Sequence, residues 1–354
     1  MPKLLMKGNE AVAEAAVLAG CRYFFGYPIT PQNQIPEYLS ERLPQVGGVY
    51  LQAESEISAI NMVYGSAATG ARVMTSSSSP GISLKQEGIS YLAGARLPCV
   101  IVNMMRGGPG LGGIQPGQAD YFQATRGGGN GDYRCIVLAP STVQEACDLT
   151  GKAFDLADEY RMPVIIVGDG FLGQMMEPVE LPAMRDLAAL PQKPWAATGF
   201  DGSRPRNVIN SLFLDPKMLE DHNIALQTMY DEVSQKHAAY ATEFTEDATL
   251  VLTAYGTTAR IARSAVTAAR AEGLKVGLVR PITLWPFPVK AFDTLAQDGI
   301  CKTVLTVELS MGQMVEDVRL AANGRMAVAL HARAGGMVPS IEELLAKIHE
   351  IMGV

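Results

Sequence analysis

Hydrophobic and polar positions alternate along the first half of the chain in a strand–helix rhythm. Short apolar runs with strand character occur at residues 23–25, 49–52, 72–76, 98–104, 135–139 and 163–168. Segments whose apolar residues recur at spacings of three and four lie between them and predict helices, over residues 8–20, near 35–39, from 55 to 70, around 86–93 and over 142–159. Strands that alternate with helices predict an α/β fold with a doubly wound parallel sheet.

The pattern changes after residue 175 and later resumes. Prolines are frequent between residues 178 and 205, and a polar helix is predicted over about 215–242. From Ala248 onward the alternation returns, with predicted strands at 249–255, 275–280, 304–309 and 326–330 and a helix at 259–271. We therefore predict a first domain over residues 1–190, a linker and arm over 191–245 that wraps a neighbour, and a smaller α/β domain over 246–354.

Composition and charge exclude several classes of function. The net charge of −7 and the pI near 5.3 argue against nucleic acid as the main partner, because phosphate binding needs clustered Lys and Arg. No apolar run approaches the roughly 18 residues of a membrane span. Lys7, Glu10 and Glu14 interrupt the N-terminal segment before the apolar core of a signal peptide could form. We expect a cytoplasmic protein with neither nucleic acid nor membrane as a partner.

The five cysteines and four histidines are scattered along the chain. No two cysteines form a C-x-x-C pair, so the spacing typical of an iron–sulfur cluster or a zinc site is absent. Reduced, mostly buried thiols are the simplest interpretation of such a set. A histidine-based metal site or triad has little support either. We expect no metal site in this chain.

The segment Gly26–Gln32, Gly-Tyr-Pro-Ile-Thr-Pro-Gln, follows an apolar strand and contains two prolines. Pro28 and Pro31 each fix their own φ and bias the preceding residue toward extended geometry. This predicts a rigid turn that presents Thr30 at the carboxyl end of a sheet, where ligands bind in open α/β folds. A stiff connection between a strand and a helix is the simpler alternative when the segment is taken alone.

Three further polar segments are expected at the same edge. Glu56 lies in the first turn of its helix, where it could merely complement the helix dipole, as Glu54 could, or present a partly buried carboxylate to a ligand nitrogen. Arg106 ends an apolar strand before a glycine-rich loop, where its guanidinium could clamp a carboxylate or simply face solvent. The serine-rich run Thr75–Gly81 is predicted as a loop, either anion-binding through backbone N–H groups or merely polar.

Gly168-Asp169-Gly170 resembles the start of the magnesium–diphosphate motif of thiamine-dependent enzymes. That motif needs an Asn about two dozen residues later, and residues 189–200 contain none. We interpret the triplet as a turn at the end of a strand.

Taken together, these segments resemble one family closely, the alpha subunit of 2-oxoacid:ferredoxin oxidoreductases. The resemblance runs from about residue 5 to residue 350, and the motifs that carry it are Gly26–Pro31, Gln52–Glu56, Gly65–Ala67, Ser79–Leu84, Arg106–Gly110, Arg280–Pro288 and Gly312–Met314. Thr69–Thr75 and Gly81–Leu92 look most like the 3-methyl-2-oxobutanoate (2-ketoisovalerate) branch. Ser79 departs from the family, which usually has Gly at this place, and could narrow or re-aim the loop.

The resemblance implies a thiamine diphosphate enzyme whose first domain binds the pyrimidine ring, followed by a domain similar to the transketolase C-terminal domain. Glu56 matches the glutamate that hydrogen-bonds the aminopyrimidine ring, which favours the tautomer that removes the thiazolium C2 proton. The other matching cofactor positions are Tyr27, Pro28 and Ile29. Thr30 and Arg106 match the positions that hold the substrate carboxylate. The catalytic residues implied are therefore Glu56, Thr30 and Arg106.

The implied reaction is the oxidative decarboxylation of a branched-chain 2-oxo acid with coenzyme A to acyl-CoA, carbon dioxide and reduced ferredoxin. Mg²⁺ and the [4Fe-4S] cluster are expected on partner subunits. A beta subunit should carry the diphosphate-binding domain and the cluster cysteines, and gamma and ferredoxin-like delta subunits are further expected partners. This chain alone should be inactive.

Three alternatives stay open. A 2-oxoglutarate:ferredoxin oxidoreductase would share the chemistry and need a basic residue near the substrate tail, which sequence alone cannot place. A non-catalytic scaffold that only holds a beta subunit fits less well, because Glu56, Thr30 and Arg106 occur together. A transketolase-like transferase would need an Asp–Asn magnesium pair in this chain or a partner without clusters.

Overall fold

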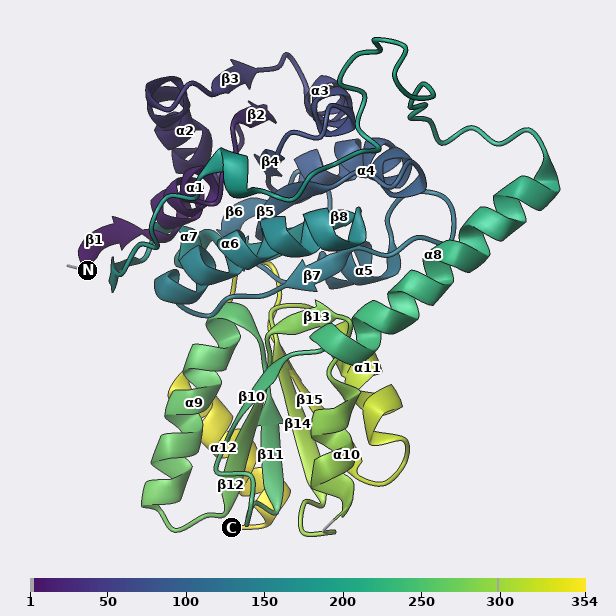
Figure 1. The fold of residues 1–354 in the computed structure, drawn as a ribbon. Helices are drawn as coiled ribbons and strands as arrows, with labels where there is room; N and C mark the ends of the chain where they lie inside the picture. The colour runs from purple at the N-terminus through teal and green to yellow at the C-terminus, as the bar shows by residue number, and fades with distance from the viewer. Residues whose placement is uncertain (1–2, 298) are drawn as a thin grey trace.

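The computed structural model describes residues 3–297 and 299–354, which form two α/β units, one above the other in Figure 1. The first sheet has the strand order β13 (Thr283–Trp285), β7 (Ile136–Leu138), β8 (Pro163–Asp169), β5 (Cys99–Gly107), β4 (Val73–Ser77), β2 (Tyr23–Gly26), β3 (Val49–Gln52). All neighbouring strands along this order are parallel except β13 and β7. β6 (Gly113–Pro116) pairs antiparallel with the end of β5.

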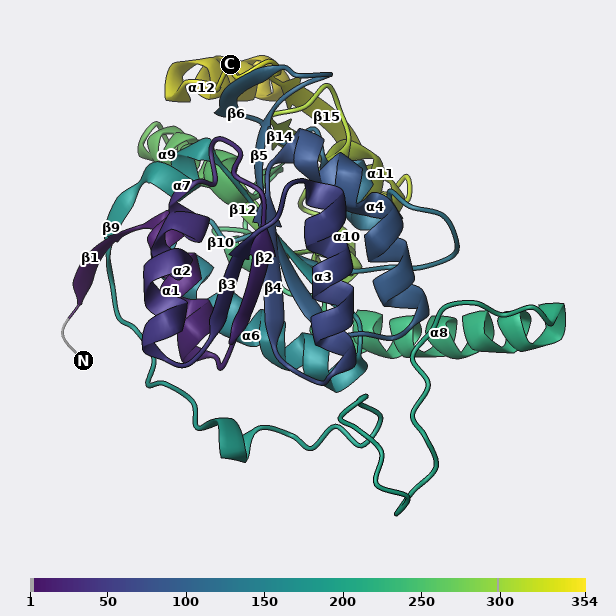
Figure 2. The same ribbon diagram turned by 90° about the horizontal axis from the view of Figure 1, so that it is seen from above.

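Helices cover both faces of the first sheet, as the predicted doubly wound fold requires (Figure 2). One face packs against α1 (Gly8–Leu18), α2 (Gln34–Gln45) and α6 (Val143–Tyr160). The other packs against α3 (Glu56–Ala68) and α4 (Ser79–Gly94). Strand β5 divides its side chains between the two: Val100 and Val102 belong to the first core, and Ile101 and Met105 to the second. The predicted fold class is confirmed.

The second sheet is smaller and mostly parallel. Its order is β10 (Tyr240–Glu243), β12 (Val276–Pro281), β11 (Leu250–Thr253), β14 (Thr303–Glu308), β15 (Ala327–Ala332), with β10 antiparallel. Its helices are α9 (Gly256–Ala271), α10 (Val289–Gln297), α11 (Met314–Ala322) and α12 (Ile341–Met352). The core beneath α9 and α12 is formed by apolar residues of the central strands, such as Leu252 and Leu305.

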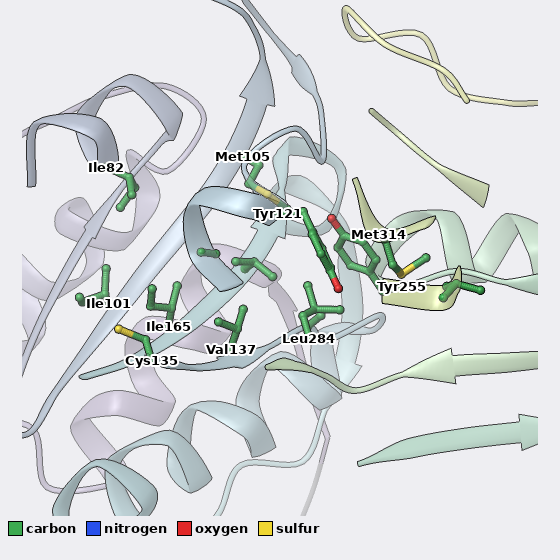
Figure 3. Close-up of a cluster of buried hydrophobic side chains, with 14 of the residues drawn as sticks. Ile82, Ile101, Met105, Tyr121, Cys135, Val137, Ile165, Tyr255, Leu284 and Met314 are labelled. Carbon is green, nitrogen blue, oxygen red and sulfur yellow. The ribbon is translucent and has the colours of Figure 1, made fainter. Parts of the chain in front are cut away.

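A continuous apolar cluster joins the two units (Figure 3). Tyr121 of α5 (Tyr121–Arg126) lies 6.0 Å from Tyr255 between ring centroids, and Met314 of α11 belongs to the same cluster. Strand β13 follows β12 in the chain yet pairs with β7 of the first sheet. The segment Arg280–Pro288 was predicted within the second domain. Through this strand pairing it also completes the first sheet, and its Leu284 is buried in the shared cluster.

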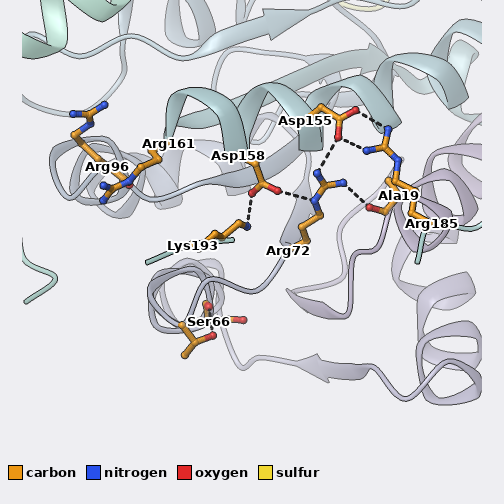
Figure 4. Close-up of polar contacts among 10 residues, drawn as sticks. Ala19, Ser66, Arg72, Arg96, Asp155, Asp158, Arg161, Arg185 and Lys193 are labelled. Carbon is orange, nitrogen blue, oxygen red and sulfur yellow. Dashed lines mark hydrogen bonds and ion pairs between the residues drawn. The ribbon is translucent and has the colours of Figure 1, made fainter. Parts of the chain in front are cut away.

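The proline-rich segment after residue 180 crosses the outside of the first unit and leads to the long helix α8 (Pro216–His237), which projects from the body (Figures 1 and 2). Ion pairs hold this segment to the first unit (Figure 4). Lys193 of the segment pairs with Asp158 of α6 (2.5 Å), and Arg185 pairs with Asp155. Arg72 of the first unit also pairs with Asp155 (2.9 Å) and Asp158 (2.8 Å). The polar helix predicted over 215–242 ends earlier, because residues 240–243 form β10.

Several elements were not predicted. They are the ribbon of β1 (Leu4–Lys7) with β9 (Met176–Val179), α7 (Gly170–Gln174), the 3₁₀ turn Leu187–Ala189, and β6, β10, β13, α5, α10, α11 and α12. The predicted loop Thr75–Gly81 is wrong over most of its length: β4 continues to Ser77, and α4 begins at Ser79 because Pro80 suits a first helical turn. No helix in the described ranges combines the length and apolarity needed to cross a membrane.

Candidate active site

The four polar segments meet at the carboxyl edge of the first sheet. β2, β4 and β5 are adjacent and parallel, so their carboxyl ends open on the same side. Nη1 of Arg106, at the end of β5, donates a hydrogen bond to the backbone oxygen of Thr30 (3.0 Å). The hydroxyl of Ser76 on β4 donates to Oε1 of Gln32 (2.5 Å). Strand β4, which neighbours β2, and the next strand, β5, thereby hold the turn that follows β2.

Glu56 is the first residue of α3 and is only 6% exposed. The helix begins here because Ser55 caps it, accepting a hydrogen bond from the backbone N–H of Ser58 (3.2 Å). A β-carbon built on Gly81 would lie under 3.0 Å from Glu56 Oε1 and from Ser77 Oγ. Any larger residue at this place would displace the side chains of Glu56 and Ser77. Within the described part of the chain, the Glu56 carboxylate accepts no hydrogen bond.

Lys85 is a site residue that the sequence analysis missed. It is fully buried on α4, and its Nζ donates a hydrogen bond to Thr75 Oγ1 (3.0 Å). Burial lowers the pKa of Lys85 to about 8, and the negative charge of Glu56 opposes this shift. The available signal was a lysine four residues after Gly81, on the face of the helix that the neighbouring apolar residues predict to be buried.

Arg106 is 8% exposed, and no acidic residue of the described chain pairs with it. Its guanidinium donates to the backbone oxygens of Thr30 and Leu111 (3.1 Å), and its Nε is buried without a partner. No carboxylate in residues 3–297 or 299–354 lies within ion-pair distance of it. Such a fixed, uncompensated cation suits an anionic ligand, above all a carboxylate.

Ser79 links the start of α4 to the end of β5. Its hydroxyl donates to Asp120 (2.6 Å) and accepts from the backbone N–H of Arg106 (3.1 Å), while Asn103 Nδ2 also donates to Asp120 (2.8 Å). Burial raises the pKa of Asp120, and the two hydrogen bonds oppose that rise. Ser79 therefore lies in a helix and not in a loop that it could narrow. Asn103, a polar residue in an apolar strand, was a visible signal; Asp120 gave none.

The predicted cofactor positions after β2 are accessible. Tyr27 and Pro28 are exposed and Ile29 is half-buried. The turn is held from inside by Gln32, whose Nε2 donates to the backbone oxygen of Tyr27 (3.3 Å). The structure places these residues beside Thr30 at the open edge, and their contact with a cofactor stays a prediction.

Asp169, at the end of β8, is used within the chain. It is 2% exposed, and its Oδ1 accepts hydrogen bonds from the backbone N–H groups of Phe171 and Leu172 (both 3.0 Å) and from Thr257 Oγ1 (2.8 Å). It caps helix α7, so the triplet is a helix start and not only a turn. Within the described ranges, His, Cys, Asp and Glu form no group that could hold a metal ion.

Comparison with known families decides the identity of this fold. Residues 14–249 match the thiamine diphosphate-binding domain of pyruvate flavodoxin/ferredoxin oxidoreductases, and residues 248–344 match core domain II of pyruvate:ferredoxin oxidoreductase. The chain belongs to the 2-oxoacid:ferredoxin oxidoreductase family. The family predicted from the motifs, and its thiamine diphosphate-binding fold, are confirmed.

Individual relatives point to one branch. The chain is 52% identical over 353 residues to ketoisovalerate oxidoreductase subunit VorB of Methanothermobacter marburgensis, covering 100% of this chain and 99% of the relative. It is 36% identical over 375 residues to 2-oxoglutarate synthase subunit KorA of Methanothermobacter thermautotrophicus, covering 97% of each. Among solved structures it is similar to 2-oxoglutarate:ferredoxin oxidoreductase from Magnetococcus marinus with 2-oxoglutarate, coenzyme A and succinyl-CoA bound, with a TM-score of 0.84 and 27% identity. The match covers 99% of this chain and 65% of that longer chain.

The residues at the edge fit the aminopyrimidine end of thiamine diphosphate. An aminopyrimidine ring carries nitrogen groups that can bond a carboxylate, and Glu56 offers one that accepts no hydrogen bond from the described chain. The hydroxyl of Ser77, on the other side of Gly81, is buried and has no hydrogen-bond partner in the described chain. A cavity of about 780 Å³ lies elsewhere, lined by residues at the amino ends of β2 and β4 such as Arg22 and Arg72. The candidate site is therefore an open edge of the sheet.

Proposed function

We propose that this chain is the alpha subunit of a 2-oxoacid:ferredoxin oxidoreductase that oxidatively decarboxylates 3-methyl-2-oxobutanoate with coenzyme A. The family and the full-length identity to a ketoisovalerate oxidoreductase subunit support the reaction and the branch. One observation of the structure carries the assignment of the site. Glu56 and Arg106 are both buried at the same open edge, and neither has an ion-pair partner in the described chain.

Thiamine diphosphate, when bound, supplies the nucleophilic carbon and the electron sink for decarboxylation. Glu56 Oε1 holds a proton in a hydrogen bond to a ring nitrogen. The Arg106 guanidinium binds the carboxylate of the 2-oxo acid, and the Thr30 hydroxyl donates to the same group. Because backbone oxygens already fix the guanidinium, little side-chain freedom is lost when the substrate binds.

Partner subunits complete the enzyme in this proposal. Relatives that this chain covers over nearly their full length are named as subunits, which supports a multi-subunit assembly. A beta subunit would cover the open edge and bring the diphosphate–Mg²⁺ site and a [4Fe-4S] cluster. Gamma and delta subunits, ferredoxin as acceptor and a cytoplasmic location are parts of the same proposal.

We also propose the division into residues 1–190, a linker and arm over 191–245, and residues 246–354. Two separate sheets and the projecting α8 support it. The strand β13 departs from a simple division, since it lies beyond residue 246 and extends the first sheet.

The 2-oxoglutarate branch is the second candidate, because the chain is 36% identical to a 2-oxoglutarate synthase subunit. A diacid substrate needs a second cation that reaches its tail. The other cation beside Glu56, Lys85, is fully buried and bonded to Thr75, so it does not reach the open edge. This observation favours the branched, apolar substrate.

The test is coenzyme A-dependent viologen reduction by the complex captured on a tag fused to this chain. We would offer 3-methyl-2-oxobutanoate, 2-oxoglutarate, pyruvate and an aryl 2-oxo acid side by side. The expected result is a preference for the branched acid. Preference for another acid would support the proposed reaction and contradict the proposed substrate. No activity from a thiamine-loaded, iron-containing complex would contradict the catalytic proposal and favour the scaffold.

A further inference from the structure

Lys85 places an ammonium group inside the first unit without an ion-pair partner. Its side chain is fully buried on α4, and its hydrogen bond to Thr75 Oγ1 (3.0 Å) joins it to a neutral hydroxyl. No carboxylate of the described residues lies within 4.0 Å of it. Lysines are almost never fully buried unless they are paired, because the charge loses its hydration. The position therefore demands a compensating charge nearby.

The helix and the strand together align Lys85 with Glu56. Gly81 and Lys85 are four residues apart on α4 and lie on one face of the helix. Gly81 contacts Ser77, and Lys85 contacts Thr75, two positions that share one face of β4. Because Gly81 also touches the Glu56 carboxylate, the two charged groups are offset by one strand step, roughly 7 Å. Lys85 lies on the inner side of Glu56, away from the open edge.

We propose that Lys85 is the internal counter-charge of Glu56, a positioning residue whose ammonium balances the charge of that carboxylate inside the protein. The inference rests on the role proposed for Glu56. Thr75 fixes the ammonium at its place behind the carboxylate. Lys85 touches neither substrate nor reacting atoms, and it acts only through its charge.

The electrostatics agree with this geometry. Burial lowers the pKa of Lys85 to about 8, so the group is still charged near pH 7, and Glu56 is the charged residue of the described chain that opposes the shift. The groups that face it from β4, Thr75 and Ser77, are neutral. The interaction is reciprocal. Two opposite charges about 7 Å apart at an effective dielectric constant near 20 stabilise each other.

The test measures proton uptake when thiamine diphosphate binds to the assembled, cofactor-stripped complex. Calorimetry in buffers of different ionisation enthalpy gives the number of protons taken up at each pH. In the wild-type complex, proton uptake should depend on pH with a measurable midpoint. In Lys85→Met, which conserves side-chain volume, the pH midpoint of proton uptake should lie roughly one to two pH units above that of the wild type. The acid limb of kcat/KM should move in the same direction.

Glu56→Gln separates this inference from the proposed function. In that variant the pH-dependent proton uptake should be absent, and adding Lys85→Met should change nothing further. Lys193→Met is the matched control, because it removes a largely buried ammonium that is paired with Asp158 in another part of the unit. Thr75→Val keeps the charge and should shift the midpoint less than Lys85→Met.

Each outcome has one meaning. An unchanged midpoint in Lys85→Met, with the cofactor still bound, would overturn the inference and leave the role of Glu56 intact. Uptake in Glu56→Gln equal to that of the wild type would overturn the proposed role of Glu56 itself. If Lys85→Met does not assemble, Lys85→Gln, which can still bond to Thr75, gives the same measurement.

Discussion

Glu56 and Asp169 are two buried acidic residues at the same edge of the first sheet, and their surroundings are opposite. Asp169 accepts three hydrogen bonds, from two backbone N–H groups at the start of α7 and from Thr257. Glu56 accepts none from the described chain and lies against Gly81. Burial and position are similar, so neither separates a structural carboxylate from one that is available to a ligand. The hydrogen-bond donors around each carboxylate distinguish the two cases.

The same contrast holds for two buried arginines. Arg72 lies at the amino end of β4 and is compensated by Asp155 and Asp158 (Figure 4). Arg106 lies at the carboxyl end of β5 and donates only to backbone oxygens. Removing a compensated charge should therefore cost stability, and removing an uncompensated one should cost activity.

The largest expected effect is that of Glu56→Gln on turnover. Gln keeps the size of the side chain but cannot hold or release the proton, so kcat should fall by roughly 10²- to 10⁴-fold. The complex should still assemble, because no hydrogen bond of the described chain is lost, and the thermal unfolding midpoint should fall somewhat, because Lys85 loses the negative charge that faces it. Steady-state viologen reduction and a thermal shift assay check both. Near-normal turnover would show that Glu56 is not a catalytic residue.

Arg106→Gln should act next most strongly, on the binding of the 2-oxo acid. The loss of a charged hydrogen bond to a carboxylate costs about 2–3 kcal/mol, which raises KM by roughly 30- to 150-fold. Arg126→Gln is the control, because that arginine is exposed and pairs with Asp317 away from β5. Substrate titrations of both variants separate the two. A KM for Arg106→Gln equal to that of the control would show that the substrate carboxylate is bound elsewhere.

The pattern of the chain predicts most of the first sheet, because its strands are short apolar runs separated by amphipathic helices. The strand predicted at 49–52 is observed at those residues. Strand β13 could not be predicted, because its pairing with β7 depends on where the second unit lies. Ile57 lies in the helix predicted from 55 to 70 and is half exposed, since the buried face of that helix is formed by residues such as Ile60 and Val63.

The site was only partly predictable for a related reason. Glu54 and Glu56 are equivalent in the sequence, yet Glu54 is exposed and accepts a hydrogen bond from Ser58, while Glu56 is buried against Gly81. That difference depends on the packing of α4 against α3, which no local pattern contains. Asp120 was missed because its contacts with Ser79 and Asn103 join segments far apart in the sequence, whereas Lys85 was missed although its place on the apolar face of α4 was a visible signal.

Asp169→Ala should lower stability and leave the chemistry intact. The substitution removes a helix cap and the acceptor for Thr257, which together should cost about 2–3 kcal/mol of the free energy of unfolding. The kcat of the folded complex should stay within about twofold of the wild type, because the Asp169 carboxylate already accepts hydrogen bonds from within the chain and is not available to a ligand. Denaturant unfolding and turnover per folded complex test this. A loss of turnover as large as that of Glu56→Gln would show that Asp169 also takes part in catalysis, which contradicts the contrast drawn between the two residues.

The pH dependence sharpens this prediction. Burial raises the pKa of Asp169 above its usual value, despite the hydrogen bonds that favour ionisation. The folded protein therefore binds this proton more tightly than the unfolded chain does, and the wild type gains stability as pH falls through the raised pKa. The stability difference between the wild type and Asp169→Ala should grow from pH 7 toward acid pH. A difference that shrinks would show that the hydrogen bonds outweigh burial.

Ser79→Ala should have the smallest effect and tests whether the unusual residue of the motif tunes Arg106. The hydroxyl bonds both Asp120 and the backbone N–H of Arg106, so its loss should cost about 1 kcal/mol of stability and raise KM for the 2-oxo acid roughly two- to fivefold. The bond favours ionised Asp120, so the stability loss should be largest near neutral pH and smaller at acid pH, where Asp120 is protonated. Ser83→Ala, four residues later and exposed on the same helix, is the control. Equal KM values in the two variants would show that Ser79 supports the fold of this edge without affecting how Arg106 binds substrate.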